Sequence, residues 1–276
     1  MRYVFLFAVS LSTVSLILAA ARIAEDLTTI TLNGHDCGPD GTATSEAGKE
    51  LNRLKNRFHI PSEEDIDAEV SLAAMLSPGN DINRFDAKRA ARIQGLVVNV
   101  MLGGNKETCN CKASAANERD THIELALAKG APSTQRVIVE VTPRIRILRG
   151  GEWTTAALRK QWKGKWVEVT GWLLFDSMHV DGAENTNPGG ERNWRATCWE
   201  VHPVTDIKPL DSPPPTSDDF QPKTLTSLHR LHAAHVARSA NGREAIVKRN
   251  KKYLDKFDKE ELEEKDEEAK ERGSKK

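Results

Sequence analysis

The run Lys163-Gly-Lys-Trp-Val-Glu-Val-Thr-Gly-Trp-Leu-Leu-Phe-Asp176 decides the fold. Apolar and polar side chains alternate from Trp166 to Thr170, and a short apolar stretch follows Gly171. A period of two is typical of a half-buried β-strand, here entered through a Gly-Lys turn and bent at the glycine. The run therefore predicts one strand, around which the neighbouring segments can be placed.

Four further strands and one helix are expected on either side of this run. Segments rich in β-branched or alternating apolar residues predict strands at 93–102, 121–128, 136–142 and 196–207. Ala157, Leu158 and Trp162 have helical spacing, which predicts a helix over residues 154–162 with a threonine as its N-cap. Pro203 lies inside the last expected strand and predicts an edge or a bend there.

This order, with the helix between the third and fourth of five strands, resembles the oligonucleotide/oligosaccharide-binding (OB) barrel. The resemblance covers residues 92–206 and implies a small five-stranded barrel whose ligand face is built from the middle strands and adjacent loops. The fold class expected is mainly β with α additions, and an ordinary antiparallel sandwich is the alternative.

The rest of the chain divides by composition. Residues 1–21 contain an apolar run behind Arg2 that ends in small residues, which indicates a signal peptide or, alternatively, an uncleaved membrane anchor. Residues 22–89 form a loop and helical extension, 90–207 the barrel, 208–223 a proline-rich linker and 224–276 a charged helical or disordered tail. Either interpretation of the N-terminus predicts an exported protein, periplasmic or extracellular, that contacts a membrane only through an uncleaved N-terminus.

Two helix signals lie in the extension. Leu51, Leu54 and Phe58 have helical spacing and predict a short helix over residues 49–58. Ser62 and Asp65 resemble a capping box, so another helix is expected to begin there.

Export changes the interpretation of the four cysteines. An even number in an oxidising compartment suggests two disulfides. Cys109 and Cys111 are too close to pair with each other, so each is expected to join Cys37 or Cys198. The alternative is a thiolate metal site that uses Cys109 and Cys111.

Potential metal ligands lie on or beside the expected strands. Asp120, His122 and Glu124 share one face of the second strand, and Glu200 and His202 share one face of the last. His179 follows the fourth strand.

If these segments meet, His122, His179 and His202, with Asp120 or Glu200, would suit zinc or another divalent metal with an open position for water. A metal-dependent hydrolase with Glu200 as general base is then the hypothesis. The alternative is that these are separate polar residues on half-exposed strands.

A different set of residues would serve a binding module of unknown ligand, whether oligonucleotide, oligosaccharide or protein. Arginines with exposed tryptophans suit stacking on bases or sugars. The candidates are Arg144, Arg146, Trp153, Trp194 and Trp199. The overall charge gives little support to nucleic acid as the ligand, because 40 basic residues balance 40 acidic ones. A binding module is the leading functional hypothesis.

The C-terminal tail contains three regularly spaced histidines. His229, His232 and His235 have spacing that would suit a metal or, more simply, a polar helix face. The chain contains no Gly-rich phosphate loop, Gly-x-Ser-x-Gly elbow or His-Glu-x-x-His pattern.

Several blocks between about residues 50 and 207 resemble a family of exported bacterial proteins of unknown function. They are Leu54-Lys-Asn-Arg57, Pro78-Gly-Asn-Asp81, Cys109-Asn-Cys111, Asp120-Thr-His-Ile-Glu-Leu125, Val139-Glu-Val-Thr-Pro-Arg144, Gly171-Trp-Leu-Leu-Phe-Asp176 and Trp199-Glu-Val-His-Pro-Val-Thr205. The resemblance agrees with the domain limits above and implies no activity.

Overall fold

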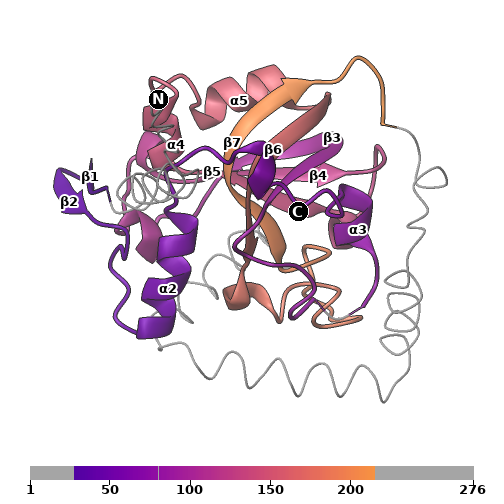
Figure 1. Ribbon diagram of the computed structural model, residues 1–276, viewed down its shortest axis with the longest axis horizontal. Helices are drawn as coiled ribbons and strands as arrows, with labels where there is room; N and C mark the ends of the chain where they lie inside the picture. Colours follow the sequence, from indigo (N-terminus) through magenta and orange to yellow (C-terminus); the bar gives the residue numbers. More distant parts are fainter. Residues whose placement is uncertain (1–27, 80, 215–276) are drawn as a thin grey trace, which may run out of the picture.

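The decisive run forms strand β6 (Trp166–Phe175), which pairs antiparallel with β3 (Ala90–Leu102) on one side and β7 (Trp199–Pro209) on the other. A computed structural model describes residues 28–79 and 81–214. With β4 (Thr121–Ala126) and β5 (Val137–Val141), these strands close a barrel in the order β3-β4-β5-β7-β6 (Figure 1). All pairs are antiparallel except β5 with β7. The mainly-β class with helical additions is confirmed.

Two helices separate β5 from β6. Helix α5 (Thr155–Trp162) has Thr154 as its N-cap, as expected, and buries Leu158 and Trp162 against the barrel. Helix α4 (Pro143–Leu148) was not predicted, although its proline at N1 and its N-cap Thr142 are ordinary helix-start signals. Pro203 lies in β7, which pairs with β5 on one side and β6 on the other. The strand is therefore not an edge strand, and the expectation of an edge is wrong.

Pro203 and Gly171 together explain the irregularity in these strands. The β6–β7 register shifts at Gly171, and a Cβ at this position would lie 2.3 Å from the Pro203 carbonyl oxygen. Only glycine allows the two backbones to approach this closely. The irregularity in this strand pair is therefore found at Gly171, where the register shifts and the backbone of β7 comes closest.

The N-terminal extension packs outside the barrel. It contains the hairpin of β1 (Ile30–Leu32) and β2 (His35–Cys37), then α2 (Glu46–Lys55) and α3 (Leu72–Leu76). Figure 1 shows the hairpin and α2 on one side of the barrel and α3 on the other. Helix α2 begins three residues earlier than predicted because Ser45 caps it, accepting from the Gly48 N–H at 3.0 Å.

Five short 3-10 turns complete the described elements. They are η1 (Glu63–Asp65), η2 (Thr108–Asn110), η3 (Ala116–Glu118), η4 (Ser133–Gln135) and η5 (Ser177–His179). The predicted capping box is confirmed at η1, where the Ser62 N–H donates to the Asp65 carboxylate at 2.7 Å.

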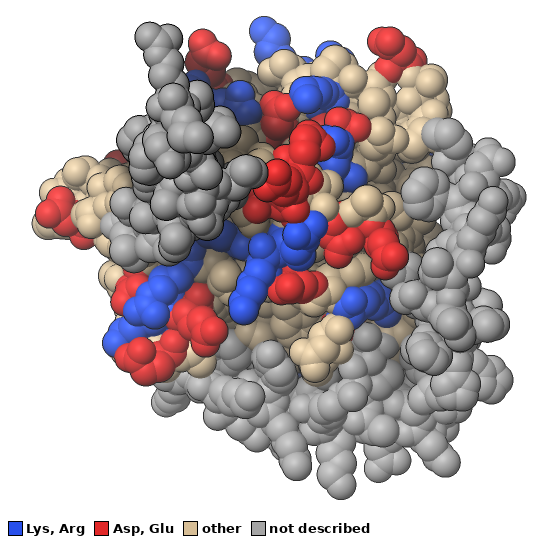
Figure 2. All heavy atoms as spheres, in the orientation of Figure 1, with Lys and Arg blue, Asp and Glu red and all other residues tan. Residues whose placement is uncertain are grey.

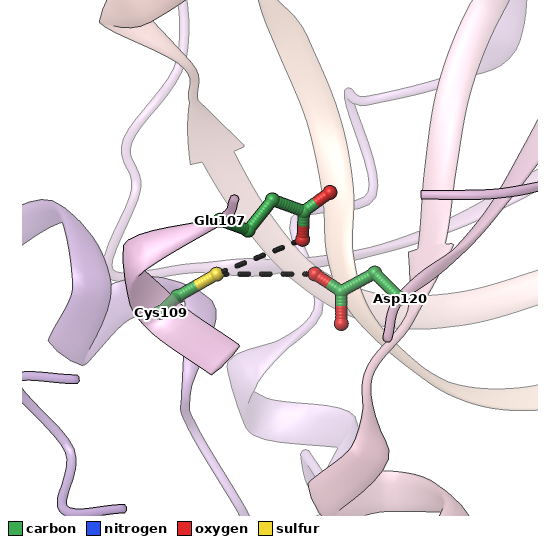
Figure 3. Close-up of side chains that lie close together, drawn as sticks. All are labelled: Glu107, Cys109 and Asp120. Carbon is green, nitrogen blue, oxygen red and sulfur yellow. Dashed lines mark hydrogen bonds between the residues drawn. The ribbon is translucent and has the colours of Figure 1, made fainter. Parts of the chain in front are cut away.

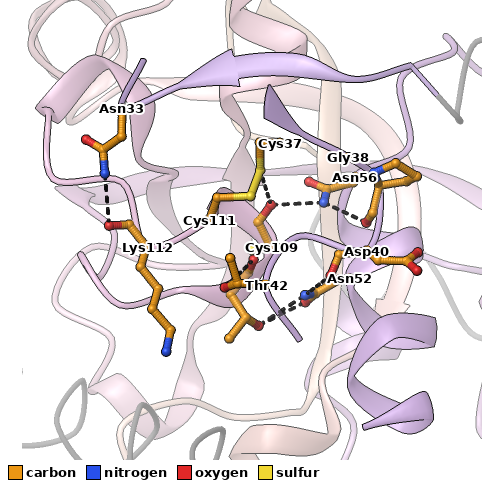
Figure 4. The surroundings of a disulfide bond; sticks show 12 residues. Asn33, Cys37, Gly38, Asp40, Thr42, Asn52, Asn56, Cys109, Cys111 and Lys112 are labelled. Carbon is orange, nitrogen blue, oxygen red and sulfur yellow. Dashed lines mark hydrogen bonds between the residues drawn. A yellow bond between two sulfur atoms is a disulfide. The ribbon is translucent and has the colours of Figure 1, made fainter. Parts of the chain in front are cut away.

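One disulfide, Cys37–Cys111, joins β2 to the segment between β3 and β4 (Figure 4). The second predicted disulfide is absent: Cys109 and Cys198 are both buried thiols. A disulfide is typical of proteins outside the cytosol. Among the described residues, no helix has the length and apolar character needed to cross a membrane.

Some predictions fall on residues that the structure does not describe. They concern the signal peptide or anchor, the linker beyond residue 214, the charged tail, and His229, His232 and His235.

Candidate functional site

Alternation along three neighbouring strands puts four polar side chains on the outer face of the barrel. They are His122 of β4, Glu140 of β5, and Glu200 and His202 of β7. His122 and Glu140 are register partners. Glu200 and His202 flank Val201, whose side chain belongs to the barrel core. The strand pattern thus brings two imidazoles and two carboxylates together on one side of the sheet.

The segment joining β3 to β4 and helix α2 cover this outer face. The segment, residues 103–120, contributes Glu107, Cys109 and Asp120 (Figure 3). Asn56, at the end of α2, donates to the Cys109 carbonyl at 3.0 Å. Each of the four barrel side chains is at most 4% exposed as a result. The polar face of the sheet is therefore an interior site and not a solvated surface.

Close packing at Gly103 and hydrogen bonds from Arg146 fix the two ends of the covering segment. At its start, a Cβ on Gly103 would lie 2.8 Å from Oε1 of Glu107 and 3.1 Å from Nε2 of His122. At its end, Arg146 donates to the Asn117 carbonyl at 2.5 Å and to Oγ1 of Thr121 at 3.0 Å. A glycine at one end and a buried guanidinium at the other hold the segment against the strands.

Six side chains form a closed ring in which each lies within 4 Å of the next; we call this the donor ring. In order they are Glu107, His122, Glu140, His202, Asp120 and Cys109. Nε2 of His122 lies 3.6 Å from Oε1 of Glu107 and 3.1 Å from Oε2 of Glu140. One imidazole nitrogen thus faces two carboxylates.

The other half of the donor ring contains the second imidazole and the thiol. Nδ1 of His202 lies 3.5 Å from Oε2 of Glu140, and its Nε2 lies 3.8 Å from Oδ2 of Asp120. Sγ of Cys109 is 3.9 Å from Oδ2 of Asp120 and 3.9 Å from Oε2 of Glu107 (Figure 3). All six side chains offer ligand atoms that transition metals accept.

Two donor-ring atoms are buried without a hydrogen-bond partner among the described residues. They are Oδ1 of Asp120 and Nε2 of His202, and both residues are 0% exposed. Leaving such an atom unpaired costs roughly 1–3 kcal/mol, so buried polar atoms are nearly always satisfied. A divalent cation would satisfy both a carboxylate oxygen and an imidazole nitrogen.

The two carboxylates of the covering segment have opposite pKa shifts. Burial, and then the negative charge of Glu107, raise the pKa of Asp120 well above its usual range. Burial also acts to raise the pKa of Glu107, but the hydrogen bond and charge of His122 outweigh it and lower that pKa. A bound metal ion would favour the ionised form of Asp120, because metal ligation competes with protonation.

A second cluster adjoins the donor ring through Glu200. Oε2 of Glu200 lies 3.2 Å from Nδ1 of His202, and its Oε1 lies 2.5 Å from Nη1 of Arg195. Glu200 also belongs to a set of possible metal donors with Asp176 and His179. Nδ1 of His179 lies 2.9 Å from Oδ2 of Asp176.

Protein cations already balance this second cluster. Arg195 pairs with Glu200, and Nζ of Lys55 lies 3.4 Å from Oδ2 of Asp176. Burial would raise the pKa of Asp176, but Lys55 and then His179 lower it well below its usual range. Both carboxylates are thus stabilised as anions by the protein itself. The donor ring, whose carboxylates contact imidazoles and not guanidinium or ammonium groups, is the better metal candidate.

The structure brings together three of the four predicted metal residues. His122, His202 and Asp120 all belong to the donor ring, whereas His179 lies in the second cluster. Glu200 is a poor choice of general base. Burial acts to raise its pKa, but the charge of Arg195 together with the hydrogen bond and charge of His202 lowers it.

The two arginines proposed for ligand binding are buried, at 1% exposed for Arg144 and 3% for Arg146. Arg144 donates to the carbonyls of Thr28, Cys37 and Gly38. Arg146 holds the covering segment as described above. Both guanidiniums satisfy backbone carbonyls that would otherwise be buried unpaired, so neither lies on an exposed ligand face.

The three tryptophans proposed for ligand binding are in different settings. Trp199 is buried, packs against Phe85 and Phe175, and donates to the Asp81 carbonyl at 2.8 Å, so it is a core residue. Trp153 is partly exposed, with the Arg149 guanidinium 4.7 Å from its ring centre.

Trp194 is also partly exposed and packs edge-on against His179. Figure 2 shows Lys and Arg interleaved with Asp and Glu over the described part of one face. The visible face thus lacks a broad basic area that would suit a nucleic-acid backbone.

Several site residues escaped the sequence analysis. Glu107, Arg195 and Lys55 have no strand pattern to mark them, because each comes from a loop or from α2. Cys109 was predicted as a disulfide partner or, alternatively, as a thiolate metal ligand with Cys111, which instead pairs with Cys37. Glu140 lies within an apolar strand, where a buried carboxylate needs a partner, and the structure supplies His122 at 3.1 Å.

No protein-family model matches this chain, and no curated protein matches it significantly.

Proposed function

We propose that this protein is an exported module that binds a divalent metal on the outer face of an OB-type barrel. Asp120, Glu140 and His202 are its core ligands, since their donor atoms lie within 4.8 Å of one another. The observation that carries the proposal is the pair of buried, unpartnered atoms, Oδ1 of Asp120 and Nε2 of His202.

The strand order supports the OB assignment. OB folds bind ligands with the face of the second and third strands and with the loops after the first and fourth. Here the second and third barrel strands contribute His122 and Glu140. The loop after the first strand contributes Glu107 and Cys109, and the loop after the fourth leads to Arg195. The donor ring therefore occupies the position at which this fold places its ligands, and the disulfide supports export.

The ligand types favour a borderline transition metal over calcium. Imidazole suits zinc, iron, copper or nickel, and carboxylates extend the choice to manganese. Zinc is the reference ion for a test because it accepts carboxylate, imidazole and thiolate ligands. Binding should weaken as pH falls, since the metal competes with protons for His202 and the carboxylates.

The test is metal analysis of the full chain, purified with its disulfide intact, stripped with chelator and then titrated with zinc. Wild-type protein should bind at least one equivalent tightly, and His202→Ala should bind one equivalent fewer than wild type. Glu124→Gln is the matched control, because Glu124 lies on the same strand as His122 but pairs with Arg136. Wild-type protein that binds no stoichiometric zinc, manganese, iron or nickel would overturn the proposal.

A metal-dependent hydrolase is the second candidate, because three protein ligands leave a position for water. Burial argues against it: the three core ligands are at most 4% exposed. Pockets of about 500 and 450 Å³ in the described part of the chain are lined by other residues. Hydrolysis of an activated phosphodiester or ester by the zinc-loaded protein, absent from His202→Ala, would favour this candidate.

A further inference from the structure

We infer that the donor ring holds two divalent cations that share Asp120, an inference that rests on the proposed metal-binding function. Two sets of three donors meet here, and in each set the ligand atoms lie within 4.8 Å of one another. One set is Glu107, Cys109 and Asp120; the other is Asp120, Glu140 and His202. Asp120 is the residue common to both.

The arrangement around Asp120 suits a bridging carboxylate. Its Oδ2 lies 3.9 Å from Sγ of Cys109 on one side and 3.8 Å from Nε2 of His202 on the other. Its Oδ1 has no hydrogen-bond partner among the described residues. A carboxylate has two oxygens and about four lone-pair sites, enough to serve two ions. Carboxylate-rich sites that hold two ions place them about 3.5–4 Å apart.

His122 connects the two donor sets. Its Nε2 lies between Glu107 of the first set and Glu140 of the second, at 3.6 Å and 3.1 Å. The imidazole can ligate an ion in either set or donate a hydrogen bond to a ligating carboxylate, and it is only 3% exposed. The two sets therefore belong to one contiguous buried site.

The buried charge of the donor ring can accommodate two divalent ions. Glu107, Asp120 and Glu140 provide three carboxylates that are no more than 6% exposed, and Cys109 adds a thiol that becomes an anion when it binds a metal. Two divalent ions offset these four negative charges, and the buried Lys55 adds a positive charge nearby. Uncompensated charge in the protein interior is costly.

The two sites differ in the softness of their ligands. The Cys109 site offers sulfur and oxygen, and the His202 site offers nitrogen and oxygen. Thiolate selects zinc and similar ions, while carboxylate and imidazole also accept manganese and iron. Cobalt(II) is a useful probe, because only an ion bound to thiolate gives an intense sulfur-to-metal charge-transfer band in the near ultraviolet.

The experiment measures zinc stoichiometry and the cobalt spectrum of the chelator-stripped, disulfide-intact full chain. Wild-type protein should bind two equivalents of zinc and show the thiolate band with cobalt. Cys109→Ser should bind one equivalent and lose the band, and His202→Ala should bind one equivalent and keep it. Cys198→Ser is the matched control: it removes the other buried thiol and should leave both readouts unchanged.

The outcomes separate this inference from the function on which it rests. One equivalent in wild-type protein, or a wild-type cobalt complex without a thiolate band, overturns the two-ion inference while the proposed function stands. No bound metal overturns both. The wild-type measurements do not depend on whether any variant folds. For each variant, circular dichroism shows whether a loss of bound metal results from unfolding.

Discussion

The guanidinium of Arg195 and the carboxylate of Glu200 form an ion pair that solvent does not reach. Nη1 lies 2.5 Å from Oε1, and the two side chains are 0% and 1% exposed. The atoms are in contact but are not aligned as a hydrogen bond, so their attraction is mainly Coulombic. Because Glu200 also contacts His202, this pair fixes one side of the donor ring.

Removing both members of this pair should cost less stability than the sum of removing each one alone. Arg195→Met leaves the buried Glu200 charge unpaired and should lower the free energy of unfolding by about 3–5 kcal/mol. The double variant Arg195→Met, Glu200→Gln should be clearly less destabilised than the sum of the single variants. Urea denaturation of all four proteins measures the coupling. Additive losses would show that the pair does not interact energetically.

The stability provided by Asp176 should depend on pH. Its folded-state pKa lies well below its value in the unfolded chain, about 3.9. This stabilisation is therefore present above about pH 4 and is lost as pH falls through the folded-state pKa. Asp176→Asn keeps an oxygen to accept from the Met178 N–H but loses the attraction to Lys55 and His179.

At pH 7 the Asp176→Asn variant should be less stable than wild type by about 3–5 kcal/mol. The difference should shrink steadily as the pH is lowered below 4. Urea denaturation at a series of pH values from 7 to 2.5 measures it. A difference that stays constant over this range would mean that packing, and not charge, explains the loss.

The Cys37–Cys111 disulfide should stabilise both the fold and the metal site. It links residues 74 apart in sequence, and closing a loop of that length stabilises a protein by about 4 kcal/mol. It also ties the segment that carries Glu107 and Cys109 to the N-terminal hairpin (Figure 4). The double variant Cys37→Ser, Cys111→Ser should therefore unfold at lower urea concentration and bind zinc more weakly. Cys198→Ser should retain wild-type zinc affinity.

Strand periodicity was enough to predict one part of the site. Alternation places His122 on one face of β4, and Glu200 and His202 on one face of β7, and the structure has them so. The same alternation also predicts that the Trp199 side chain lies in the core, as it does. Since Val201 points into the core, the residue two before it must do the same. Trp199 was nevertheless predicted at the surface.

The rest of the site depends on contacts between segments far apart in the chain. Glu140 meets His122 only because β4 and β5 pair in one register. Glu107 and Cys109 reach the barrel because the segment that carries them folds back over it. Local sequence carries no signal for either event. Arg144 and Arg146 were predicted on a ligand face because α4 was missed, and their guanidiniums instead satisfy carbonyls of distant loops.

The barrel itself should depend on glycine at position 171. A Cβ there would lie 2.3 Å from the Pro203 carbonyl oxygen and 2.9 Å from Cα of Val204, both backbone atoms that cannot move without separating β6 from β7. Gly171→Ala should therefore cost about 3 kcal/mol or more.

Gly95→Ala is the matched control, because its nearest contact, at 2.6 Å, is the end of the Leu72 side chain, which can change rotamer. It should cost about 1 kcal/mol. Thermal unfolding followed by circular dichroism compares the two variants. Equal losses would contradict the conclusion that the approach of β7 requires a glycine in β6.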